Sequence, residues 1–254
     1  MLLLLLLLLL SPSIYLSLSI FLSFFNYQKV TTAAAVDEGF FEGMAQRVLA
    51  ALAGVCPRVL YVPGNHDPPA MFAAEDDANV HGRVLQLAPG LHVAGWGGSV
   101  QAVEAGQVVW QPYPCPDEAL PARLEHLQAA VAALPDSDRV ILLTHNGPAG
   151  SSTALVTGPD PNSLTTPGLR ANDIYTGSAA LRALLTAPAT QARCVLNVHG
   201  HTHQALGLAR LGGVPVLNPG SLPYTRSFAH LTLVRSTPTS PWNLDAVSFK
   251  LLPG

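Results

Sequence analysis

The apolar positions of the chain predict helices that alternate with short buried strands. Residues 38–54 place Phe40, Met44 and Val48 at helical spacing, and Gly54 is typical of the position after a helix. Elsewhere the pattern changes to runs of consecutive apolar residues that are short and rich in β-branched side chains, which indicates buried strands. This alternation predicts an α/β fold.

The same pattern recurs through the rest of the sequence. Further helices are expected within 116–134, with Asp117 as the N-terminal cap, and within 178–187. The expected strands are residues 58–62, 83–88, 91–95, 139–144, 193–198, 214–218, 228–235 and 246–252, and the last three suggest an antiparallel end to the domain. Residues 150–173 show no periodicity and are expected to form a loop.

Three of the expected strands end at polar corners that carry histidine. These corners are residues 64–67 with the sequence GNHD, His145, and residues 199–203 with the sequence HGHTH. Sites in α/β folds lie beyond the carboxyl ends of the strands, so the corners are expected on one rim. Each histidine alone is also compatible with a solvated side chain. Together, imidazole and side-chain oxygen donors suit Zn, Mn, Fe or Ni, and they predict a divalent metal site.

The first 28 residues follow a different pattern. Met1 precedes nine leucines, and no charged side chain occurs before Lys29. The segment is long and apolar enough to span a bilayer, which makes it a signal anchor or uncleaved leader, or else a low-complexity stretch from a mistaken gene start. Either account divides the chain into a leader at 1–28 and a domain at 36–254. The protein is membrane-anchored if the leader is real and cytoplasmic otherwise.

Charge and cysteine content limit the partners of the domain. The net charge is −3, and no cluster of Lys or Arg occurs, which argues against a nucleic-acid-binding surface. We therefore expect a small-molecule substrate. The cysteines Cys56, Cys115 and Cys194 are widely spaced, which suits neither a disulfide framework nor a thiolate zinc site.

The three corners resemble the third, fourth and fifth signature blocks of the calcineurin-like metallophosphoesterases. GNHD, the histidine that ends LLTH and GHTH occur in the family's order, and NPGSL at 218–222 is similar to the turn that follows the last block. The likeness covers about residues 40–234. It implies a sandwich of two mixed β-sheets flanked by helices, and hydrolysis of phosphomonoesters or phosphodiesters.

The resemblance also implies a role for each residue of these blocks. Asn65, His145 and His201 would hold one of the family's two metal ions, and His203 would be a ligand of the other. His66 would act at the leaving-group oxygen, with Asp67 orienting its imidazole. Two such ions polarise a phosphoryl group and activate the water between them.

The family's first two blocks, DxH and GDxxD, are missing upstream of GNHD, so the resemblance describes an N-terminally truncated domain. The acids there are Asp37, Glu38 and Glu42. Asp37 is either a replacement for the bridging aspartate or an ordinary acid at a helix start. The count of ligands reduces the expected metals from two to one. The chain is then an impaired hydrolase or a catalytically inactive metal-binding or scaffolding relative; a zinc site on an unrelated α/β fold is the third interpretation.

Overall fold

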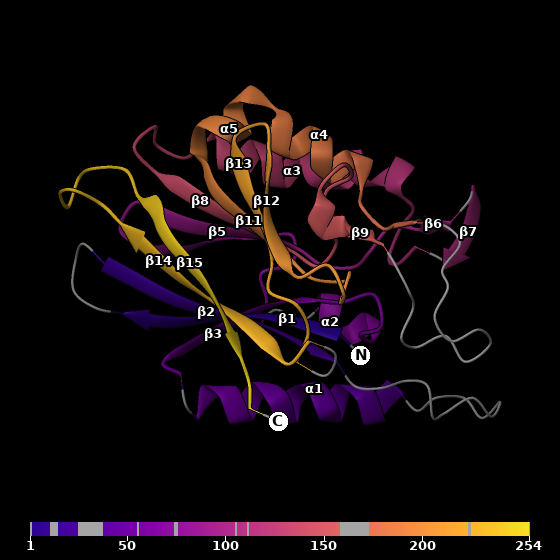
Figure 1. The fold of residues 1–254 in the computed structure, drawn as a ribbon. Helices are drawn as coiled ribbons and strands as arrows, with labels where there is room; N and C mark the ends of the chain where they lie inside the picture. Colours follow the sequence, from indigo (N-terminus) through magenta and orange to yellow (C-terminus); the bar gives the residue numbers. More distant parts are fainter. Residues whose placement is uncertain are drawn as a thin grey trace.

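The chain forms a mixed α/β sandwich in which two β-sheets face each other and helices cover their outer sides (Figure 1). The computed structural model describes residues 2–10, 15–24, 38–54, 56–73, 76–104, 106–110, 112–157, 173–222 and 225–253. The predicted class, a sandwich of two β-sheets flanked by helices, is confirmed, but the five-stranded sheet is antiparallel rather than mixed, and the N-terminal truncation stays a prediction.

The larger sheet has six strands in the order β12-β13-β11-β8-β5-β4. The strands are β4 (Val84–Ala88), β5 (Leu91–Trp96), β8 (Arg139–Thr144), β11 (Cys194–His199), β12 (Gly207–Leu211) and β13 (Val214–Asn218). From β5 to β13 the neighbouring strands are parallel, and the two edge strands are antiparallel. The carboxyl ends of β8 and β11 therefore lie side by side.

Three helices cover the outer face of this sheet: α3 (Leu120–Ala132), α4 (Ala179–Thr186) and α5 (Pro188–Arg193) (Figure 1). The predicted helices are confirmed, but the predicted capping role of Asp117 is wrong. Asp117 begins a short 3₁₀ turn, η2 (Asp117–Ala119), and its carboxylate accepts hydrogen bonds from Ser178 Oγ at 2.5 Å and Ala179 N at 2.9 Å. Asp117 therefore supports the N-terminus of α4, which is distant in sequence and has Ser178 as its N-cap.

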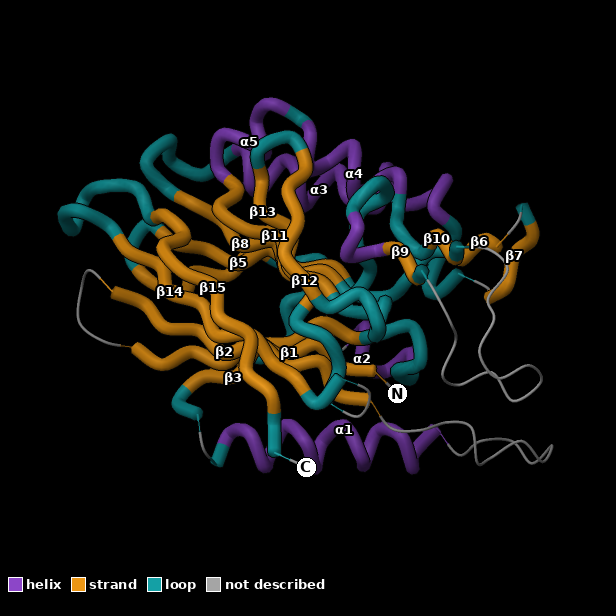
Figure 2. The backbone as a smooth tube through the Cα atoms, viewed as in Figure 1, coloured by secondary structure: helices purple, strands orange, loops and turns teal. Residues whose placement is uncertain are grey.

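The second sheet has five strands in the order β15-β14-β2-β1-β3. The strands are β1 (Leu2–Leu10), β2 (Tyr15–Phe24), β3 (Arg58–Pro63), β14 (Ser227–Val234) and β15 (Asn243–Leu251). Every neighbouring pair is antiparallel. Figure 2 shows this sheet facing the six-stranded one, with α1 (Glu38–Ala53) on its outer side.

Residues 2–10 and 15–24 belong to the segment expected to form a leader. In the structure they are the two strands that connect β3 to β14, so they hydrogen-bond to the domain from which we expected them to stand apart. Within the described residues, no helix has the length and apolar character needed to cross a membrane. The division at 1–28 and 36–254 stays a prediction.

The hydrophobic core fills the space between the two sheets. Along β3, side chains alternate between this core and the outer face of the sheet. Leu60 and Val62 point inward and pack with Val93 of β5 and Leu143 of β8. Tyr61 points outward to α1 and the short helix α2 (Pro69–Ala73). A strand covered on both faces reads as a continuous apolar run, which is why this pattern was recognisable in the sequence.

A small sheet in the order β7-β6-β10-β9 lies beside the sandwich. Its strands are β6 (Ala102–Glu104), β7 (Gln107–Trp110), β9 (Leu155–Val156) and β10 (Ile174–Tyr175), and a 3₁₀ turn, η3 (Ser152–Ala154), precedes β9. The loop expected at 150–173 thus starts with regular structure, and its part at 158–172 lies outside the described residues.

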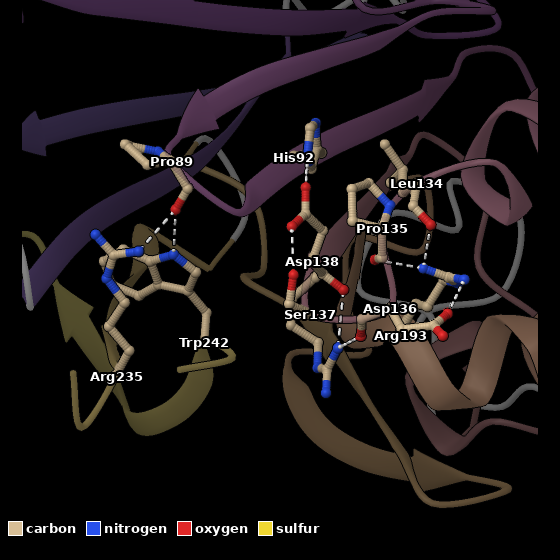
Figure 3. A network of polar contacts seen from close by, with 11 residues as sticks. Pro89, His92, Leu134, Pro135, Asp136, Ser137, Asp138, Arg193, Arg235 and Trp242 are labelled. Atoms are coloured by element: carbon tan, nitrogen blue, oxygen red, sulfur yellow. Dashed lines mark hydrogen bonds and ion pairs between the residues drawn. The ribbon is translucent and has the colours of Figure 1, made fainter. Parts of the chain in front are cut away.

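At the amino ends of β5 and β8, polar contacts join the two sheets (Figure 3). Arg235, after β14, and Trp242, before β15, both donate to the carbonyl oxygen of Pro89, each at 3.0 Å. The Arg235 guanidinium also lies 4.7 Å from the Trp242 ring centre. Nearby, the Asp138 carboxylate contacts His92 Nε2 at 2.7 Å. The loops of one sheet are therefore fastened to the β4–β5 turn of the other.

Candidate functional site

The three histidine corners meet where the two sheets adjoin. Asn65 follows β3 of the five-stranded sheet, whereas His145 and His201 follow β8 and β11 of the six-stranded sheet. Asn65 Oδ1 lies 3.1 Å from His145 Nε2, and the rings of His145 and His201 are 5.3 Å apart at an angle of 68°. The structure thus brings together residues that are distant in the sequence, as the rim prediction required.

The GNHD corner is a tight turn that depends on close packing. Asp67 is buried, its Oδ2 accepts from the backbone N–H of Gly64 at 2.7 Å, and its own N–H donates to Gly64 O at 3.1 Å. Gly97 of the facing turn packs so closely that a Cβ there would lie 2.5 Å from Pro63 O. The corner is therefore held from inside by Asp67 and from outside by a glycine-rich turn.

Burial raises the pKa of Asp67 to about 7, although the Gly64 hydrogen bond opposes this change. Its Oδ1 is buried and has no hydrogen-bond partner among the described residues. His66 is exposed at the rim, and partial desolvation lowers its pKa. The role of Asp67 in orienting His66 stays a prediction.

His145 is fully buried and is the centre of the cluster. Burial lowers its pKa well below the usual value, and the neighbouring His201, His203 and His66 lower it further because their charges would repel. Among the residues described, nothing hydrogen-bonds to its Nδ1. His145 is therefore neutral, which is the form of imidazole that binds metals.

The GHTH corner places His201 in an unusual backbone conformation. Its φ is 59°, in the left-handed region that residues other than glycine rarely adopt. Burial, with the repulsion of His203 and other histidines, lowers the pKa of His201 to about 3, and burial lowers that of His203 to about 4. Both imidazoles are thus neutral over the physiological range.

His199 is the first residue of the HGHTH motif, and no role was predicted for it. It is fully buried, and its Nε2 lies 2.8 Å from Thr153 Oγ1. Gly147, two residues after His145, must be glycine because a Cβ there would lie 2.6 Å from the His199 ring. His199 therefore packs directly beneath the His145 corner. Its position directly after an apolar strand was the only signal in the sequence.

The donor atoms of this site suit one divalent cation. Two ligands at right angles on a metal with bonds of about 2.1 Å lie about 3.0 Å apart, close to the observed 3.1 Å between Asn65 Oδ1 and His145 Nε2. His201 and His203 supply two more neutral imidazoles. As they stand, however, no three His, Cys, Asp or Glu side chains in the described part of the chain form a metal-binding group. The site therefore fits a divalent cation in the chemical type of its donor atoms and in the distance between Asn65 Oδ1 and His145 Nε2.

The strand β1 lies directly beside β3 and pairs with it up to the GNHD corner. Leu3 of β1 is the residue paired with Pro63, at the start of the GNHD corner. Glu38 and Glu42 lie in α1, on the outer side of the sheet. Asp37, the alternative bridging ligand, lies outside the described residues. The roles expected for Asn65, His66, Asp67, His145, His201 and His203 stay predictions.

Comparison with known proteins finds weak likeness in fold. No known protein family and no curated protein matches the chain. The solved structures that resemble it include a crystal structure at 17% identity (TM-score 0.43), a Staphylococcus aureus protein provisionally assigned as a 5′-nucleotidase and solved with α-ketoglutarate at 14% (0.38), and the calcineurin-like phosphoesterase YfkN from Bacillus subtilis at 15% (0.28). The matches cover 74%, 69% and 63% of this chain but 65%, 31% and 43% of theirs. These values extend no conclusion beyond the α/β fold class.

Proposed function

We propose that the chain is a calcineurin-like metallophosphoesterase, a metal-dependent hydrolase of phosphoester bonds, that keeps the part of the metal site built by GNHD, His145 and GHTH. The observation that supports this proposal is the contact of Asn65 Oδ1 with His145 Nε2 across the two sheets, beside the His201 ring. An amide oxygen and neutral imidazoles from separate strand ends are an arrangement typical of ligands rather than of core packing.

In this proposal Asn65, His145 and His201 hold one divalent cation of the Mn, Fe, Zn or Ni type, and His203 lies beside it. A bound ion of this kind polarises a phosphoryl oxygen and lowers the pKa of water. His66, at the exposed rim, contributes a hydrogen bond to the leaving-group oxygen. Because its pKa is lowered, the imidazole is neutral at pH 7 and acts as a hydrogen-bond donor rather than as a charged acid.

A second candidate is a metal-binding or scaffolding protein without catalytic activity. The observation in its favour is the pairing of Leu3 with Pro63, which places an apolar strand end beside the GNHD corner. A second metal ion would need carboxylate ligands in this region. The two candidates therefore share one metal site and differ in turnover.

The experiment that separates them uses the full-length chain with Mn²⁺ or Zn²⁺. Calorimetric titration measures metal binding, and release of nitrophenolate from bis(p-nitrophenyl) phosphate and p-nitrophenyl phosphate measures hydrolysis. We expect binding together with hydrolysis of one ester, and His66→Ala should lower kcat by about 100-fold or more while metal affinity is kept. His126→Ala, at an exposed histidine of α3, is the control. Binding without hydrolysis supports the scaffold, and absence of binding contradicts both.

A further inference from the structure

The left-handed conformation of His201 needs support from the residues around it. A side chain with a Cβ is disfavoured at a φ of 59°, so such a conformation persists only where neighbouring contacts determine it. His201 lies between Gly200 and Thr202 in the GHTH corner. Both neighbours are held by buried polar side chains from other segments.

On the Gly200 side, the contacts form a chain with a consistent direction. His199 Nδ1 donates to Gly200 O at 3.1 Å, which leaves Nε2 to accept from the Thr153 hydroxyl at 2.8 Å. Thr153 Oγ1 can then accept from Ser151 Oγ at 2.6 Å. The backbone N–H of Gly200 also donates to His145 O at 3.0 Å. On the Gly200 side, each of these polar atoms therefore has a hydrogen-bond partner.

On the other side, Thr202 is held through both its backbone and its side chain. Asn218 Nδ2 donates to Thr202 O at 2.8 Å and to Thr153 O at 3.1 Å. The Thr202 hydroxyl lies 2.6 Å from Thr176 Oγ1, which donates to Ala154 O at 2.8 Å. The contacts therefore close into one network that joins η3, β10 and the end of β13 to the GHTH corner.

These side chains are buried, with exposed fractions of 0% for Thr176, His199 and Asn218 and 2% for Thr153 and Thr202. A buried polar group is costly unless its hydrogen bonds are made. The network is thus satisfied only when the backbone from 199 to 202 has the observed path. A shift of His201 to an ordinary φ would move Gly200 O or Thr202 O away from their donors.

We propose that these residues form a positioning network that holds His201 in its left-handed conformation and so directs its imidazole toward His145. The network consists of Thr153, Thr176, His199, Thr202 and Asn218. This inference rests on the proposed metal site. Its members are positioning residues, because they contact the backbone on either side of His201 and not the proposed metal ion.

The test removes one hydroxyl of the network while keeping the shape of the side chain. Thr202→Val abolishes the contact with Thr176, and Thr202→Ser restores the hydroxyl. Thr190→Val is the matched control, since Thr190 is equally buried, at 2%, but lies in α5 behind the six-stranded sheet. The readouts are the dissociation constant for Mn²⁺ by calorimetry, the melting temperature, and the φ of residue 201 in a crystal structure of each variant.

We expect Thr202→Val to weaken Mn²⁺ binding by about 10- to 100-fold, as loss of supporting contacts around a metal ligand does, while Thr202→Ser and Thr190→Val stay close to wild type. Equal affinity in Thr202→Val and wild type overturns the inference, even if the melting temperature falls. If wild type binds neither Mn²⁺ nor Zn²⁺, the proposed function fails. The φ of residue 201 then decides the inference, and an unchanged left-handed value in Thr202→Val overturns it. If Thr202→Val does not fold, Thr176→Val breaks the same contact and takes its place.

Discussion

The two sheets of the sandwich differ in strand direction, and this difference determines what each brings to the site. In the six-stranded sheet, β5, β8, β11 and β13 run parallel, so their carboxyl ends gather at one edge. Two of these ends carry His145 and the HGHTH corner. In the five-stranded sheet, every pair is antiparallel, and consecutive strands end at opposite edges.

At this edge of the antiparallel sheet, the carboxyl ends of β3, β2 and β15 alternate with the amino ends of β1 and β14, so only every second strand ends here, and β3 leads into the GNHD corner. A parallel sheet concentrates chemistry at one edge, whereas an antiparallel sheet disperses it.

The largest effect is expected for amide hydrogen exchange in β1. This strand lies between β2 and β3, so its amides are hydrogen-bonded on both sides and exchange only when the sheet opens. We expect protection of about 1000-fold or more, similar to that of β8 in the other sheet, measured by mass spectrometry on the full chain. If residues 2–10 exchanged at the rate of an unstructured peptide, they would not belong to the five-stranded sheet. The division into a leader and a domain would then be supported.

A smaller effect is expected where the two sheets touch. Gly97→Ala places a Cβ 2.5 Å from Pro63 O, so one of the two segments has to move. We expect a loss of about 3 kcal/mol in the free energy of unfolding, measured in urea. Gly43→Ala, in α1, meets no atom within 4 Å and should instead stabilise the protein by about 0.5–1 kcal/mol. Equal effects of the two substitutions would contradict close packing at this contact.

The smallest effect concerns pH. His81 Nδ1 accepts from Gly97 N–H at 2.8 Å, its ring lies 4.6 Å from that of Trp96, and burial lowers its pKa to about 4. The unfolded chain then binds more protons than the folded one between about pH 4 and 6.5, so stability falls as pH falls through this window. From about pH 7.5 to 5 the contribution is on the order of 2 kcal/mol.

The glutamine of His81→Gln does not titrate. Between pH 7.5 and 5 this variant should therefore lose about 2 kcal/mol less of its free energy of unfolding than wild type does. The other buried histidines change the stability with pH in the same way in both proteins. The difference between wild type and His81→Gln therefore reports on His81 alone. Urea unfolding of both proteins at the two pH values measures it. Parallel losses in wild type and His81→Gln would show that His81 keeps its ordinary pKa.

Elements with a clear period were predictable from the sequence. The helices α1 and α4 and the strands β3, β8 and β11 lie where the apolar pattern placed them. The run of leucines that forms β1 has no alternation, so nothing in it indicates a strand or a face. The strand β12 was missed because it is a short edge strand in which the apolar Leu208 is exposed, so apolar and polar residues do not alternate along it. Asp117 hydrogen-bonds to the N-terminus of a different helix, α4, because tertiary contact overrides the local motif.

Within the site, the convergence of Asn65, His145 and His201 followed from strand ends and was predictable. The supporting residues Thr153 and Thr176 were not, because they lie in irregular segments whose partners are decided only by the packing of η3 and β10 against the GHTH corner. Hydroxyl side chains carry no periodic pattern. Their role becomes visible only when burial and hydrogen-bond partners are known.

The contacts of Arg235 and Trp242 with Pro89 have a mechanical consequence for the rim. They join the two sheets at the end far from the histidine corners, so at the rim the sheets are joined by other contacts, among them that of Asn65 with His145. A ligand that bridges these two residues would act as a cross-link between the sheets, and its occupancy would raise the resistance of the whole sandwich to unfolding.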